Sequence, residues 1–122
     1  MPITAKEGEA IMWCLGQIVN YPDRALLSET DPLRILIEEG FLRAEIMKAG
    51  EAMFDVAYGD WLSDPMTPLD KSILRVCVEN TTWIGEYLRS LPGMVREAKA
   101  ALRSLALKLE AFDIEVNHIP AD

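Results

Sequence analysis

The sequence predicts an all-α protein, a bundle of four to five helices followed by an extended C-terminal tail. Apolar residues recur three or four positions apart along most of the chain, as they do on the buried face of a helix. Capping patterns and Pro or Gly residues divide these periodic runs into separate helices. The 122 residues fit one domain, 1–122, and can bury a core without disulfides or a metal. We place the helices at about 5–20, 32–39, 41–58, 68–90 and 93–112.

The first two helices are recognised by their N-terminal caps. Thr4 and Glu7 make a capping box, in which the hydroxyl and the carboxylate each accept a hydrogen bond from a free backbone N–H. Asp31 followed by Pro32 supplies an N-cap and a first-turn proline. One uninterrupted helix of about 30 residues from Pro32 would span ~45 Å, which is long for a domain of this size. We therefore expect a break at Gly40.

The third and fourth helices follow the same logic. The apolar stripe of the third helix includes the small residues Ala49 and Gly50, which would let another helix backbone approach closely. Thr67 and Pro68 form the start of the fourth helix, with the hydroxyl as N-cap.

The last helix has the most regular pattern. Its apolar residues are separated by alternating steps of three and four, which is a heptad seam suited to near-parallel helix packing. The seam is too short for an independent coiled coil, so a bundle helix is favoured. We expect the first, third, fourth and fifth helices to supply the core. In the tail, alternation of Ile114, Val116 and His118 predicts either a short strand or an arm. The seam residues are Val95, Ala98, Leu102, Leu105, Leu109 and Phe112.

The net charge of −8 is concentrated in one part of the sequence. Residues 23–70 contain eleven acidic and four basic residues, a net charge of −7. An acidic protein is repelled by nucleic-acid phosphates and by anionic membranes, so we expect neither as a partner. The acidic segment is either a solvated surface or a surface for a basic protein partner.

Metal, redox and export signals are missing from the sequence. Cys14 and Cys77 are 63 positions apart, each has apolar neighbours, and no second pair offers zinc-ligand spacing. We predict buried free thiols, no metal and no cofactor. The N-terminus lacks the basic, apolar and small-residue succession of a signal peptide, and no apolar run reaches the length of a membrane helix. We therefore expect a cytoplasmic protein.

The segment CVENTTWIGEY, residues 77–87, groups a thiol, carboxylates, an amide and hydroxyls like a crowded active site. Wound as a helix, it places Cys77 and Asn80 on an apolar side and both glutamates on the opposite side, where Arg75 can pair with Glu79. Catalytic carboxylates need a desolvated pocket, so we assign no catalytic residue.

These observations favour a protein–protein interaction module, a homodimer without catalytic activity of its own. Asn80 on an apolar face either bonds to a loop within the monomer or fixes the register of an assembly. Two other functions stay open: an acidic inhibitor or nucleic-acid mimic that occupies a basic groove, and a small enzyme with an unrecognised pocket. The candidate interface residues are Met53, Trp61, Asn80, Trp83, Tyr87, Leu102, Leu105 and Leu109.

Overall fold

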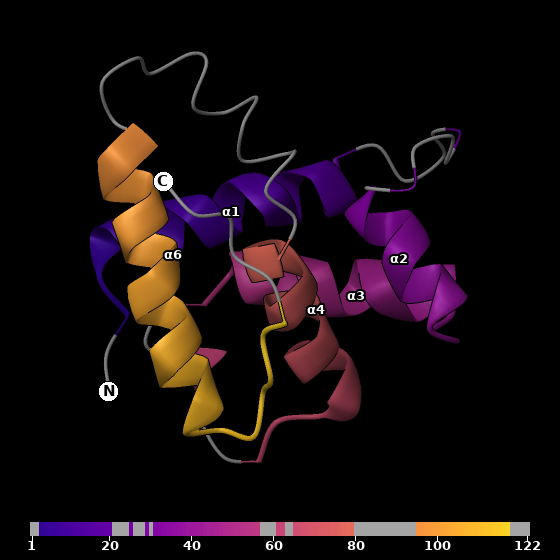
Figure 1. The fold of residues 1–122 in the computed structure, drawn as a ribbon. Coiled ribbons are helices and arrows are strands. Elements are labelled where there is room, and N and C mark those ends of the chain that lie inside the picture. Colours follow the sequence, from indigo (N-terminus) through magenta and orange to yellow (C-terminus); the bar gives the residue numbers. More distant parts are fainter. Residues whose placement is uncertain are drawn as a thin grey trace.

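The computed structural model describes residues 3–20, 25, 29, 31–56, 61–62, 65–79 and 95–117, and within them the chain is all-helical. Five helices pack together over these residues, and none of the described segments forms a strand. This confirms the predicted fold class. The helices are α1 (Ala5–Val19), α2 (Pro32–Glu38), α3 (Arg43–Phe54), α4 (Pro68–Glu79) and α6 (Val95–Glu110), as labelled in Figure 1.

Helices α1 and α4 are both central, because each of them packs against all four of the other helices. In Figure 1, α6 crosses the N-terminal half of α1 at a steep angle, and α2 lies toward the opposite end of the molecule. Helix α4 packs against α1, α2, α3 and α6. The core between these helices contains the fully buried side chains of Ile11, Leu15, Ile18, Leu33, Leu36, Ile46, Ile73, Leu74, Leu102, Leu105 and Leu109.

The predicted N-terminal caps of α1, α2 and α4 are confirmed. Thr4 Oγ1 accepts a hydrogen bond from the backbone N–H of Glu7 at 3.2 Å, and Glu7 Oε1 accepts one from the backbone N–H of Thr4 at 3.2 Å. Asp31 caps α2 by accepting a 2.9 Å bond from a first-turn N–H, and Thr67 does the same for α4 at 3.1 Å. These side chains satisfy donors that a helix N-terminus leaves unpaired.

The predicted break at Gly40 is also confirmed. Gly40 has a φ of 107°, which only glycine adopts without strain. Its N–H donates to Ile37 O at 3.0 Å and the Phe41 N–H donates to Leu36 O at 3.2 Å. This pair of bonds is a Schellman motif, which ends a helix by turning the chain through a left-handed residue.

The end of α6 repeats the motif with a different residue. Asp113 takes the left-handed position with a φ of 59°, and the Ile114 N–H donates to Leu109 O at 3.1 Å. Ile114 and Leu109 are both buried, which is the apolar contact that accompanies this motif. Asp113 therefore ends the helix at the cost of backbone strain that glycine would avoid.

Gly50, one of the two small residues predicted to allow close packing, does so. A Cβ added to Gly50 would lie 2.7 Å from Val19 Cγ1, which is inside van der Waals contact. No side chain larger than hydrogen fits between α1 and α3 at this point without movement. The approach of α3 to the C-terminal end of α1 thus depends on Gly50.

Four expectations about the helices and the tail need correction or stand outside the described residues. Helix α3 runs from Arg43 to Phe54 rather than over 41–58. It begins late because the Schellman motif holds Phe41 and because Leu42 has the extended backbone of an N-cap residue. The second predicted helix also supplies core residues, since Leu33 and Leu36 are fully buried. The continuation of the fourth helix to residue 90 lies in 80–94, outside the described residues. Residues 114–117 form no strand, and 118–122 are not described.

None of the helices in the described part of the chain is long and apolar enough to cross a membrane.

Candidate functional site

The three leucines of the predicted contact seam, Leu102, Leu105 and Leu109, lie inside the protein. Leu102 is 1% exposed, and Leu105 and Leu109 are fully buried in the core between α6, α1 and α4. In this conformation these side chains cannot contact a second molecule. The heptad spacing identified the buried face of α6 correctly, but the partner of that face is the chain's own core.

Two further candidates are also internal. Met53 is 7% exposed and Trp61 is 3% exposed. The Trp61 indole Nε1–H donates to the backbone oxygen of Met53 at 2.8 Å, which satisfies one of the carbonyl groups left open at the end of α3. Trp61 therefore covers its own core. Asn80, Trp83 and Tyr87, the other candidates, lie outside the described residues.

The outward face of α6 carries a second, shorter stripe. Leu107 is 68% exposed, although α6 buries its other described leucines. Ala100, Ser104 and Ala111 are exposed on the same face, so the four residues are separated by steps of four, three and four. This spacing places them on one line along the helix. We call Ala100, Ser104, Leu107 and Ala111 the outer stripe.

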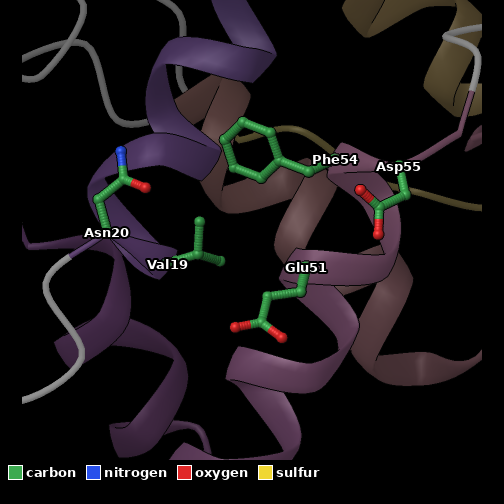
Figure 2. Close-up of a pocket in the computed structure, with 5 residues that line it drawn as sticks. All are labelled: Val19, Asn20, Glu51, Phe54 and Asp55. Carbon is green, nitrogen blue, oxygen red and sulfur yellow. The ribbon is translucent and has the colours of Figure 1, made fainter.

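A hollow of about 300 Å³ lies where the C-terminal ends of α1 and α3 meet. Figure 2 shows five side chains that line it among the described residues, with the Phe54 ring turned toward α1 and the Glu51 carboxylate pointing into the space between the helices. Val19 and Phe54 are half-buried, and the polar groups of Asn20, Glu51 and Asp55 are exposed. The hollow is therefore an open surface depression with an apolar wall and an acidic rim.

The position of the hollow adds to its negative charge. A helix C-terminus carries a partial negative charge from its unpaired carbonyl groups, and two such ends meet here. Neither α1 nor α3 has a basic residue in its last turn. Glu51 and Asp55 add two carboxylates, and among the described residues neither forms an ion pair. Sequence reasoning noted the acidic 23–70 segment but missed the hollow, because residues of α1 complete it.

Two carboxylates elsewhere have structural partners. Glu7 is 1% exposed, and its Oε1 lies 2.5 Å from Lys108 Nζ, which joins α1 to α6. Glu79, expected on a solvated face, is instead half-buried: Arg75 pairs with it at 3.3 Å, as predicted, and its Oε1 accepts the Asn117 N–H at 2.7 Å. These groups hold helices and the tail in place.

The two cysteines meet in the core, which their 63-residue separation did not predict. Both are fully buried and free, as expected. The pKa of the Cys77 thiol lies well above its usual value, because its side chain hydrogen-bonds with Cys14 and because burial disfavours the thiolate. A group protonated in this way is a poor nucleophile.

Within the described ranges, no three His, Cys, Asp or Glu side chains come together as metal ligands would. The described residues that line the hollow supply carboxylates, an amide and apolar groups, so the hollow offers hydrogen-bond acceptors and negative charge beside an apolar wall. No known protein family matches the chain, and neither a curated protein sequence nor a solved structure is detectably similar to it.

Proposed function

We propose that the chain is a protein–protein interaction module that self-associates and has no catalytic activity of its own. The observation that carries this is Leu107, 68% exposed at the centre of the outer stripe of α6. A single exposed leucine is ordinary on a protein surface. Of the four neighbours one turn from Leu107, Ser104 and Ala111 are small enough to let a second helix approach closely, and Arg103 and Glu110 flank the outer stripe with opposite charges.

The spacing of the outer stripe suits an antiparallel pair of α6 helices related by a two-fold axis. With the axis beside residues 105 and 106, Ala100 would face Ala111 of the partner subunit, and Ser104 would face Leu107 of the partner subunit. Each large side chain would then meet a small one, as in packed helix interfaces. A two-fold contact of this kind is the commonest route to homodimers.

The buried free thiols support a cytoplasmic location for this module. Reduced cysteines without disulfides are the usual state in the cytoplasm. This compartment was expected from the sequence and remains part of the proposal.

Sedimentation velocity of the wild-type chain and two variants tests the self-association. Leu107→Glu removes an exposed leucine from the outer stripe, and Leu42→Glu makes the same change at a leucine that is 65% exposed on another part of the surface. Because dimerisation would bury two copies of Leu107, we expect Leu107→Glu to weaken it at least about thirtyfold and Leu42→Glu to leave it unchanged. A monomeric wild type, or equal effects of the two variants, would refute the proposal.

A further inference from the structure

The hollow between the ends of α1 and α3 carries negative charge that no ion pair among the described residues offsets. The carboxylates of Glu51 and Asp55 and two helix C-termini surround it, and no basic residue stands in the last turn of either helix. Carboxylates at a helix C-terminus are unfavourable, because the helix dipole has the same sign there. A bound cation would offset both the mutual repulsion of these charges and their repulsion by the helix ends.

The apolar wall specifies which kind of cation fits. The Phe54 ring is half-buried and lies near α1, since a Cβ on Gly16 would be 3.9 Å from its Cζ atom. Together with Val19 it offers a surface for an alkyl stem or a flat charged group. An arginine side chain has both parts, and its guanidinium can stack on an aromatic ring while it bonds to carboxylates. A hollow of about 300 Å³ has room for a side chain rather than for a folded element.

From these observations we propose that the hollow is a docking site for an arginine side chain in a basic segment of another protein. Glu51 and Asp55 accept hydrogen bonds from the guanidinium, the Asn20 side-chain oxygen is a third acceptor, and Phe54 and Val19 contact the stem. The site uses α1 and α3, whereas the proposed dimer uses α6. The two proposals are therefore independent, and either can fail without the other.

Titration of the ¹⁵N-labelled chain with a blocked Gly-Arg-Gly-Arg-Gly peptide, followed by NMR, tests the site. The expected result is saturable shifts of backbone amides at residues 19–20 and 51–55. The counterpart peptide with citrulline, which keeps the shape of arginine and loses the charge, should give no saturable shifts. The lysine peptide should bind more weakly than the arginine peptide, because an ammonium does not stack as a guanidinium does.

Matched protein variants distinguish specific binding in the hollow from non-specific electrostatic attraction of the peptide to an acidic surface. Glu51→Gln with Asp55→Asn removes both carboxylates, and Glu45→Gln removes an exposed carboxylate near the start of the same helix. The double variant should fold at least as well as the wild type, because it takes two negative charges from a helix C-terminus. We expect it to weaken peptide binding about tenfold and the control to have no effect. Shifts spread over the whole acidic surface, equal losses in variant and control, or undiminished binding of the citrulline peptide would overturn the proposal.

Discussion

The contact between Gly50 and α1 makes a prediction with two opposing terms. Gly50→Ala replaces glycine inside a helix, which by intrinsic propensity alone stabilises the helix by about 1 kcal/mol. The new methyl group would lie 2.7 Å from Val19 Cγ1 and 3.8 Å from Ile18 Cγ2. Val19 has a β-branched side chain with one preferred rotamer in a helix, so it cannot turn away without cost.

The steric term should dominate. Adding a methyl group to a packed contact typically costs about 1–3 kcal/mol. We therefore expect Gly50→Ala to lower the free energy of unfolding by about 1 kcal/mol net, measured by urea denaturation at fixed protein concentration. Gly16→Ala is the matched control in the partner helix. Its added Cβ would meet Asn20 Nδ2 at 3.4 Å and Phe54 Cζ at 3.9 Å, which are ordinary contacts. For Gly16→Ala the helix propensity of alanine should dominate, so the free energy of unfolding should rise by roughly 0.5–1 kcal/mol.

Making Gly50→Ala in a Val19→Ala variant as well as in the wild type shows whether the contact with Val19 causes the loss of stability. In Val19→Ala the atom that collides with the new methyl group is gone, so adding Gly50→Ala should there be neutral or stabilising. The interaction between the two substitutions is then the measured cost of the contact. If Gly50→Ala stabilises the wild-type chain as much as Gly16→Ala does, or behaves identically in both backgrounds, the close approach of α1 and α3 is wrong.

Three other predictions concern single side chains. Asp113→Gly should raise the free energy of unfolding by roughly 0.5–1 kcal/mol in urea melts, because glycine adopts the φ of 59° without strain; a loss of stability would contradict the left-handed cap. Lys108→Met should destabilise the chain by about 3 kcal/mol at neutral pH, because it leaves the buried Glu7 carboxylate without its cation. Adding Glu7→Gln should restore most of that loss, and no restoration would show that the charge pair is not the cause. Cys77 should resist alkylation in the folded chain and react in guanidinium, and rapid reaction of the native chain would contradict its burial. Because the pKa of the Cys77 thiol is raised above the usual 9.0 in the folded chain, the unfolded chain releases the thiol proton at a lower pH than the folded chain does. The contribution of this thiol to the free energy of unfolding is therefore fully present below about pH 9 and decreases as the pH rises above it.

The helix boundaries were predictable where the signal is local. The Thr4–Glu7 box, the Asp31 cap and the Gly40 break each involve residues within a few positions of one another, and all three are present. The start of α3 was predicted two residues early. The motif that ends α2 includes Phe41, and Leu42 is then the extended N-cap residue of α3; helical periodicity alone does not reveal either requirement.

Which surfaces meet was predictable only in part. Periodicity showed that one face of α6 is apolar, and Leu105 and Leu109 are indeed buried. It does not say whether such a face packs on the same chain or on another copy, and here it packs on the same chain. For the same reason the meeting of Cys14 and Cys77 could not be predicted. Each residue's face follows from its own helix, but their contact depends on how α1 and α4 pack.

The candidate sites needed the tertiary structure. The acidic 23–70 segment was visible in the sequence, but Glu51 and Asp55 line a hollow only because Val19 and Asn20, about thirty positions earlier, lie beside them. The outer stripe can be recognised only when the buried face of α6 is known, because that face leaves Leu107 exposed on the opposite side.

The central claim, that the outer face of α6 pairs with the same face of a second chain, is tested most directly by an intermolecular distance. Glu110→Cys places one nitroxide spin label per chain on an exposed position of α6, and the buried native cysteines should not be labelled. In the antiparallel pairing, the two labels should lie roughly 15–30 Å apart by helix rise and interhelical spacing. A dipolar distance in that range, lost in Leu107→Glu, is the predicted result. Isolated spins in the otherwise wild-type chain, or a distance that Leu107→Glu leaves unchanged, would contradict the claim.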